Sequence, residues 1–167
     1  PSPTPGPSCP DLLRNGGFET DLNWSFIGGV PGGLSTRYVR SGARSLRLGL
    51  ETDPPYYSFS SAEQELVLPS GSGTATLSFW YRVVSNDPSK GQAYVLIRDA
   101  NQAFHKLGDL DLSVQDWTRV SFDTSAYLGQ NVAVRLTVVN GTTGAAVAVY
   151  IDDAAWAACA ETPATPT

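Results

Sequence analysis

The sequence has no methionine, one histidine and two cysteines among its 167 residues, and only 16% of the residues are charged. The single histidine, His105, has no identifiable nucleophilic partner, so we expect an exposed histidine and no Ser-His-Asp or Cys-His catalytic site. The net charge of −5 argues against a nucleic-acid partner, because phosphate binding requires clustered lysine and arginine. No apolar run approaches the roughly 20 residues of a membrane-spanning helix, so we expect no membrane span.

Proline, threonine and serine dominate the two ends of the chain. The segment PSPTPGPS occupies positions 1–8, and AETPATPT occupies positions 160–167. Residues of this kind cannot pack a core and favour extended, semi-rigid spacers of polyproline character. We therefore predict linkers at 1–8 and 160–167 on either side of one module at 9–159, which is long enough to bury its own core.

The two cysteines, Cys9 and Cys159, stand where the predicted module meets the predicted linkers. A disulfide between them would close a loop of about 150 residues, and chain-entropy arguments give it a stabilisation of about 4–5 kcal/mol. Such a bond indicates an oxidising setting, so we expect an extracellular or cell-surface location. The alternative is two separate buried thiols. We favour the disulfide because it would lock the two ends of the module together.

Alternation of apolar and polar residues predicts β-strands throughout the module. In the segment 76–84, one side carries Leu77, Phe79, Tyr81 and Val83, and the other carries Ser78, Trp80 and Arg82. Further strands are predicted near Leu12 and at 35–40, 44–50, 59–68, 93–98, 117–123, 132–138 and 147–151. Turns rich in glycine, proline and asparagine separate these segments, and only 125–128 suggests a helical turn. This pattern predicts an all-β protein with an antiparallel β-sandwich of the jelly-roll type.

Several short motifs occur in a characteristic order along the module: NGGFE at 15–19, SGARSL at 41–46, LSFWYR at 77–82 and VYIDD at 149–153. This order resembles the jelly-roll carbohydrate-binding modules of the galactose-binding-like superfamily and the related MAM-like domains of secreted bacterial proteins. The resemblance covers Asp11 to Cys159. It implies the fold but leaves the ligand open, because such modules bind many glycans and some bind none.

The resemblance also implies a structural Ca²⁺ between the first and last strands. Its ligands would be the side chains of Glu19 and Asp152, with backbone carbonyls from the loop that contains Ser41 and Arg44. If the cysteine pair sets an antiparallel register, Asp152 lies opposite Gly16, near Glu19. Two carboxylates that close repel unless a cation lies between them, and Ca²⁺ prefers oxygen ligands. The alternative is that Glu19 caps backbone amides while Asp152 is a solvated strand end.

Sugar binding requires an exposed aromatic ring flanked by hydrogen-bonding groups. Alternation places Trp80 and Arg82 on the outer side of their strand, and we expect three further residues to share that face: Tyr94, Arg98 and Arg135. A second candidate site is the loop that contains Tyr56 and Tyr57. The alternative is that Trp80 and Tyr94 form a second core layer. The remaining tryptophans are predicted core anchors: Trp24, Trp117 and Trp156.

Hydroxyl residues among prolines predict O-glycosylation at Thr4, Ser8, Thr162 and Thr165. Asn140 begins an Asn-Gly-Thr triplet that matches the N-glycosylation pattern, and Asn23 begins another such triplet. Sugars on the linkers would stiffen and protect them.

Two functions remain open on this sequence. The first is a non-catalytic structural module of an extracellular fibre or cell-surface assembly, joined through glycosylated linkers to copies of itself or to neighbouring modules. The alternative is a carbohydrate-binding module that anchors a secreted enzyme or adhesin to polysaccharide. We do not expect an enzyme, because the carboxylate pairs Glu63/Glu65 and Asp109/Asp111 have a spacing that any exposed strand or loop offers. The fold alone cannot separate the first two functions.

Overall fold

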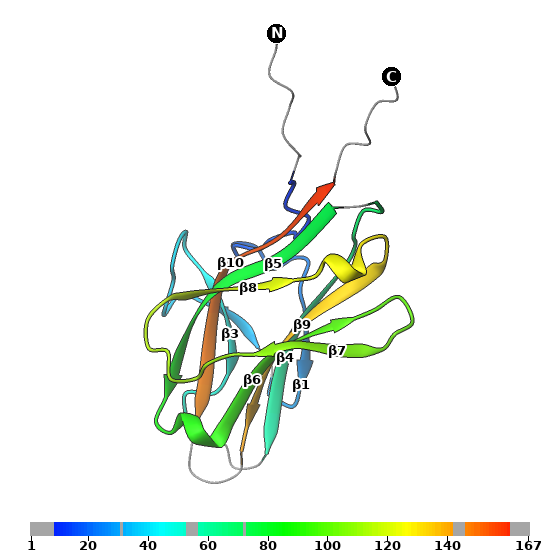
Figure 1. Ribbon diagram of the computed structural model, residues 1–167. Helices are drawn as coiled ribbons and strands as arrows, with labels where there is room; N and C mark the ends of the chain where they lie inside the picture. Colours follow the sequence, from blue (N-terminus) through cyan, green and yellow to red (C-terminus); the bar gives the residue numbers. More distant parts are fainter. Residues whose placement is uncertain (1–8, 31, 53–56, 72, 142–145, 161–167) are drawn as a thin grey trace, which may run out of the picture.

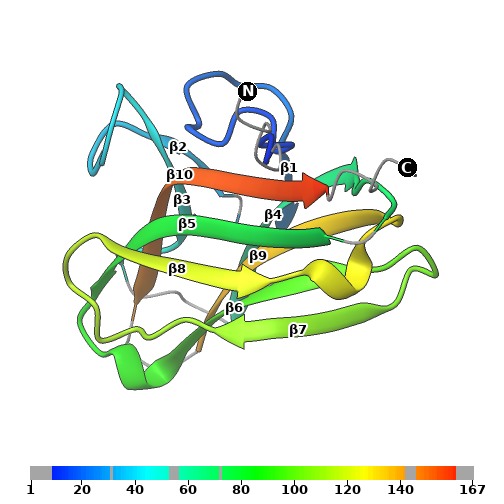
Figure 2. The same cartoon turned by 45° about the horizontal axis from the view of Figure 1, so that its top comes forward.

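Two five-stranded antiparallel sheets stack face to face in the computed structural model, which describes residues 9–30, 32–52, 57–71, 73–141 and 146–160 (Figures 1 and 2). Sheet I contains, in spatial order, β1 (Ser25–Gly28), β4 (Ser58–Val67), β9 (Asn131–Asn140), β6 (Gly91–Arg98) and β7 (Phe104–Asp109). Sheet II contains β2 (Gly33–Ser35), β3 (Ser45–Gly49), β10 (Val147–Ala160), β5 (Gly73–Ser85) and β8 (Thr118–Asp123). The predicted antiparallel β-sandwich is confirmed.

The core lies between the sheets and is built by the alternation visible in the sequence. The inward side of β5 buries Leu77, Phe79, Tyr81 and Val83. In the other sheet, β9 buries the side chains of Val132, Val134, Leu136 and Val138. Because alternate residues of a strand point to opposite faces, each strand sends one set into this core and the other set outward. The outward sets therefore decide what the molecule presents to a ligand.

The tryptophans differ in burial. Trp156 is fully buried, and its indole Nε1 donates a 2.8 Å hydrogen bond to Thr124 Oγ1, as suits a core anchor. Trp24 is partly buried and packs against the core. Trp117 is half-buried and lies outside the main hydrophobic cluster. The prediction that Trp117 is a core anchor is therefore wrong, because it precedes β8 at a sheet edge.

Two edge strands were not visible in the sequence. β1 is only four residues long, and the first three residues of β7 are all exposed, so neither shows clear alternation. Conversely, the strand predicted at 35–40 ends at Ser35, and residues 36–44 form a loop. The helical turn predicted at 125–128 is confirmed as the 3₁₀ helix η2 (Ser125–Tyr127), and a second one is η1 (Pro88–Lys90).

No helix among the described residues is long and apolar enough to cross a membrane.

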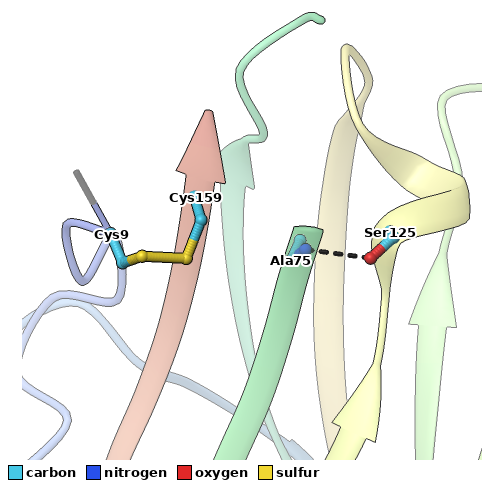
Figure 3. Close-up of a disulfide and its surroundings, with 4 residues drawn as sticks. All are labelled: Cys9, Ala75, Ser125 and Cys159. Atoms are coloured by element: carbon cyan, nitrogen blue, oxygen red, sulfur yellow. Dashed lines mark hydrogen bonds between the residues drawn. A yellow bond between two sulfur atoms is a disulfide. The ribbon is translucent and has the colours of Figure 1, made fainter. Parts of the chain in front are cut away.

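A disulfide joins Cys9 to Cys159 at the end of β10 (Figure 3). On the side of β10 away from Cys9, the amide of Ala75 in β5 donates a 3.0 Å hydrogen bond to Ser125 Oγ. The segment after Cys9 follows β10 in an antiparallel direction through a bridge between Asp11 and Ala157. The two ends of the module therefore lie side by side, as the cysteine spacing predicted.

The register along this pairing shifts further along β10. A β-bulge lies between Asp152 and Ala155, and the amide of Ala154 donates to the carbonyl of Gly16 at 2.9 Å. Gly16 thus faces Ala154 and not Asp152, which the sequence had placed opposite it. A Cβ atom on Gly16 would lie 1.9 Å from the Ala154 carbonyl oxygen, so this close approach requires glycine.

Candidate functional site

The 36–44 loop covers the part of the outer face of sheet II that β10 and β5 form. The ring of Tyr38 packs edge-on against Tyr150, with 4.9 Å between centroids. The guanidinium of Arg40 lies 3.7 Å from the centroid of the Trp80 ring, and that of Arg82 lies 4.1 Å from the centroid of Tyr38. Each contact joins the loop to a strand of sheet II. Trp80 and Arg82 are therefore half-buried packing residues, which corrects the interpretation of Trp80 as an open sugar platform.

A buried carboxylate holds this loop in place. Asp152 Oδ2 accepts hydrogen bonds from the backbone amides of Arg40 (2.9 Å) and Ser41 (3.2 Å), and Oδ1 accepts one from Asp153 (2.8 Å). Asp152 is fully buried, and burial raises its pKa while the three amide donors act in the opposite direction. The second acid, Asp153, pairs with the Arg40 guanidinium at 2.7 Å. Asp152 is not a solvated strand end.

Glu19 holds the other end of the same loop. Its carboxylate accepts hydrogen bonds from the amides of Ala43 (3.0 and 3.1 Å) and Arg44 (3.2 Å). The same carboxylate lies against Gly42, whose φ is +71°. A Cβ atom at Gly42 would lie 2.2 Å from Glu19 Oε1, so this position requires glycine. The guanidinium of Arg44 donates to the Glu19 carbonyl oxygen and pairs with Asp21 at 3.0 Å. Glu19 caps backbone amides, as one of the two alternatives predicted.

These contacts bear on the predicted Ca²⁺ site. The carboxylates of Glu19 and Asp152 both point at N–H donors of the 40–44 segment. The described residues contain no group of three or more His, Cys, Asp or Glu side chains that could hold a metal ion. As they stand, the two carboxylates are satisfied by hydrogen bonds to these backbone amides. Calcium binding here stays a prediction.

The outer face of sheet I has a different character. We call the outward residues at its centre the sheet I face; they are Ser61, Glu63, Glu65, Tyr94, Leu96, Arg98, Phe104, Lys106, Ala133, Arg135 and Thr137. Strand register aligns Ser61, Thr137 and Tyr94 in one row across β4, β9 and β6. Tyr94, Arg98 and Arg135 thus share a face, as predicted. That face is not the one that carries Trp80 and Arg82, because β5 belongs to the other sheet.

Glu63 organises the charges of the sheet I face. Its Oε1 accepts a 2.8 Å hydrogen bond from the Arg98 guanidinium, and its Oε2 accepts a 2.7 Å bond from Arg135 Nε. The hydrogen bond to Glu63 also raises the pKa of Arg98. Glu65 lies 3.5 Å from the same guanidinium. This cluster holds fork-shaped donors and carboxylate acceptors in fixed positions on a solvent-facing sheet.

Two aromatic rings lie beside this cluster. The Arg135 guanidinium lies 4.6 Å from the centroid of Phe104, and Lys106 Nζ lies 5.0 Å from that of Tyr94. Lys106 also pairs with Asp109 at 2.9 Å, and its side chain is half-exposed. Phe104 keeps 46% of its surface exposed, although it is a large apolar residue. Among the described residues, these contacts join strands of sheet I to one another and not to a covering loop.

Two short hydroxyl side chains, Ser61 and Thr137, lie among the longer side chains of the sheet I face. Ser61 and Thr137 share a 2.8 Å hydrogen bond between their hydroxyls and are only 1% and 5% exposed, although they point outward. Their low exposure shows that neighbouring groups cover these two hydroxyls. Beyond one end of the face lies a pocket of about 200 Å³ lined by Tyr57, Lys90, Gly91, Gln92, Val139 and Gly141. Tyr57 is exposed at this pocket, whereas Tyr56 lies outside the described residues.

The sequence missed three residues of this face: Glu63, Phe104 and Lys106. Glu63 had been noted only as one of a pair with Glu65, and Phe104 and Lys106 belong to the unpredicted strand β7. The aromatic residue Phe104, followed directly by His105 and Lys106, is a signal that could have identified the two residues of β7. His105, as predicted, is a partly exposed strand residue, and its Nε2 pairs with Asp99 at 2.7 Å.

The structure bears directly on one of the predicted glycosylation sites, Asn140. The O-glycosylation candidates lie outside the described residues: Thr4, Ser8, Thr162 and Thr165. Asn140 is buried, its Oδ1 accepts a 2.7 Å hydrogen bond from Val147, and its amide nitrogen is enclosed by protein. A glycan needs that nitrogen in solvent, so the prediction of N-glycosylation at Asn140 is wrong.

No model of a known protein family matches the chain, and no curated protein matches it. Among solved structures, the chain is similar to a family 61 carbohydrate-binding module in complex with β-1,4-galactotriose, with a TM-score of 0.65, 16% identity, and 88% of this chain and 97% of that chain covered. It is similar to the CBM22-1 xylan-binding domain from Paenibacillus barcinonensis, with a TM-score of 0.65, 17% identity, and 95% and 100% covered.

A tailspike protein of bacteriophage CBA120, described as an enzymatically active domain, also matches, with a TM-score of 0.59 and 14% identity; the match covers 87% of this chain but only 21% of that chain. At these identities the matches establish the fold alone. The chain has the jelly-roll fold of carbohydrate-binding modules.

Proposed function

We propose that this domain is a non-catalytic carbohydrate-binding module that binds polysaccharide on the sheet I face. The observation that carries the proposal is the cluster in which Glu63 positions Arg98 and Arg135 beside the exposed ring of Phe104. Supporting it, two structural neighbours are described as a galactotriose complex and a xylan-binding domain.

The chemistry of the face suits a neutral glycan. A sugar ring has an apolar C–H side that packs on an aromatic ring such as Phe104 or Tyr94, and its hydroxyls both donate and accept hydrogen bonds. The guanidinium groups can donate to those hydroxyls, and Glu63 and Glu65 can accept from them. The face carries three cations and three nearby carboxylates, counting Asp109, so it has no net charge to favour a charged polymer.

The position of the chain ends favours a connecting role as well. The disulfide brings both ends of the module to one place at the end of β10 (Figure 1). Linkers at 1–8 and 160–167 would then attach the module to neighbouring parts of an extracellular protein from a single point. Attachment to copies of itself in a fibre is part of this proposal, and analytical ultracentrifugation of the full chain tests it.

Affinity electrophoresis of the full chain through gels that contain β-1,4-galactan, xylan or mixed-linkage glucan tests the binding proposal. We expect retardation by at least one of these polymers, and a loss of about tenfold in affinity for Phe104→Ala and for Tyr94→Ala. Trp80→Ala is the matched control, because it removes a ring from the opposite face. Equal weakening by all three substitutions, or retardation by none of the polymers, would contradict the assignment.

Calcium binding near Glu19 and Asp152 is a separate proposal that rests on the family resemblance. Calorimetric titration of chelator-treated protein with Ca²⁺ tests it. Binding with a rise in the unfolding midpoint would support the site. No heat of binding and an unchanged midpoint would indicate that amide hydrogen bonds alone hold the 40–44 segment.

A further inference from the structure

The two lateral edges of the sandwich are closed in different ways. At the edge formed by β7 and β8, the ring of Phe122 fills the space, and a Cβ atom on Gly108 would lie 2.7 Å from it. At the opposite edge, between β1 and β2, lies a pocket of about 250 Å³. Its lining includes Phe26 from β1 and Leu34 from β2, and the 15–24 segment covers one side of it. This edge is therefore open to a ligand where the other is packed.

One wall of the pocket consists of apolar side chains that are partly exposed to solvent. Leu22 is 67% exposed and Phe26 is 40% exposed, and both line the pocket. Trp24 completes this wall and is held in position, because its Nε1 donates a 3.0 Å hydrogen bond to the Asn15 carbonyl and its ring packs against Phe18 at 5.2 Å between centroids. Apolar groups gathered around a cavity and left in contact with water are typical of a binding site.

The polar part of the lining carries fixed hydrogen-bonding groups. Asp21 Oδ1 pairs with Arg44 at 3.0 Å, and the backbone of Arg44 is bound by the Glu19 carboxylate, so this guanidinium is anchored. The side chain of Asp21 is 85% exposed. Among the described residues, neither Asp21 Oδ2 nor the hydroxyl of Thr20 has a hydrogen-bond partner in the protein. The pocket therefore offers acceptors and donors next to an apolar wall.

We propose that this pocket binds one sugar residue, at the end or at a side branch of a glycan, separately from the sheet I face. A pyranose ring combines an apolar C–H face with a rim of hydroxyls, which matches the Trp24 and Phe26 wall beside Asp21 and Arg44. A fatty acyl chain would desolvate the ion pair without replacing its hydrogen bonds. The volume lies below the range of about 300–1,000 Å³ that is typical for larger ligands, so it suits a single ring.

Amide and indole NMR spectra of the full chain, titrated with D-glucose, D-galactose, D-mannose, D-xylose and L-arabinose, test the proposal. We expect at least one of these sugars to shift the indole signal of Trp24 and the amides of 20–26, with a Kd of about 1–10 mM. The signals of Tyr94 and of Phe104 should not move with the same sugar at the same midpoint.

Three variants separate this pocket from the sheet I face. Asp21→Ala should weaken the Trp24 response about threefold to tenfold, because it removes an exposed acceptor without touching the core. The matched control is Asp116→Ala, an exposed carboxylate outside the pocket, which should change nothing. Tyr94→Ala should leave the Trp24 response intact while polysaccharide retardation falls, so failure at one site is distinguishable from failure at the other.

Two results would overturn the proposal. One is the absence of any Trp24 shift with all five sugars. The other is a Trp24 shift with phenol, used as a purely aromatic probe, that no sugar reproduces, since that would identify a pocket for an apolar group alone.

Discussion

The two outer faces of the sandwich use the same residue types in different ways. Both carry aromatic rings with cations above them: Trp80 beneath Arg40 on sheet II, and Phe104 beneath Arg135 on sheet I. On sheet II the cation comes from a loop that crosses the strands, and buried Asp152 anchors that loop. On sheet I the cation comes from a strand of the same sheet. Aromatic and arginine content alone therefore does not distinguish a covered face from an open one; the distinction is whether a covering loop supplies one member of each pair.

The largest effect on stability should come from a change that touches neither face. Replacing both Cys9 and Cys159 with serine should lower the free energy of unfolding by about 4 kcal/mol, because the unfolded chain regains the entropy of a very long loop. Urea unfolding measures this loss. Polysaccharide affinity of the folded fraction should stay the same. A loss below about 1 kcal/mol would mean that the pairing around Asp11 and Ala157 holds the ends without the bond.

Releasing the covering loop should have the next largest effect. In Asp152→Asn, one side-chain oxygen becomes an NH₂ group, so the amides that now bind that oxygen lose their acceptor. We expect a loss of about 2 kcal/mol in urea unfolding. Asp116→Asn is the control, since its exposed side chain should tolerate the same change. We also expect Asp152→Asn to leave polysaccharide retardation unchanged. Stronger retardation would mean that the uncovered face of sheet II binds polysaccharide as well.

Double-mutant cycles compare the two cation–ring pairs directly. Alanine replacements of Arg40 and Trp80 should show a coupling energy of about 1 kcal/mol, because the covered pair is shielded from water. The same cycle on Arg135 and Phe104 should give about 0.5 kcal/mol, since Phe104 is exposed. Thermal or urea unfolding of the four single and two double variants measures both values. A larger coupling on sheet I would reverse the distinction between the faces.

The smallest expected effect is the ionisation of one tyrosine, Tyr150, on the covered part of sheet II. Burial, together with the hydrogen bond to Glu51, raises the pKa of Tyr150 to about 12. The folded-state pKa is raised, so this tyrosine contributes stability that is fully present below pH 10 and is lost as pH rises through about 12. Ultraviolet absorbance of the phenolate should detect a tyrosine that ionises near pH 12 and that is absent in Tyr150→Phe. An unchanged titration in that variant would contradict the burial of this ring.

Local sequence pattern predicted most of the sandwich but could not assign strands to sheets. Alternation identified β5, β6 and β9 and correctly placed Trp80, Tyr94 and Arg135 on outward sides. It could not show that Trp80 and Tyr94 face opposite directions, because strand order is set by long-range pairing. The cysteine spacing did predict a long-range contact, since a disulfide fixes which segments meet.

The failures at the loops have a similar cause. Residues 36–40 have strand-like side chains, but the amide of Arg40 donates to the buried Asp152 carboxylate and not to a neighbouring strand. No local sequence pattern around Arg40 indicates that its hydrogen-bond acceptor lies 112 positions away. Phe104 was missed because β7 lies at a sheet edge and buries little on either side, so its apolar and polar residues do not alternate clearly.

The position of the disulfide has a mechanical consequence. If the module is joined to neighbouring parts through both of its ends, as proposed above, a pull enters it at Cys9 and leaves it at Cys159, and the two sulfurs are covalently joined. Tension is then carried through that bond and bypasses the strands between residues 10 and 158. Under such a load the sandwich, with the proposed binding face on sheet I, should keep its shape.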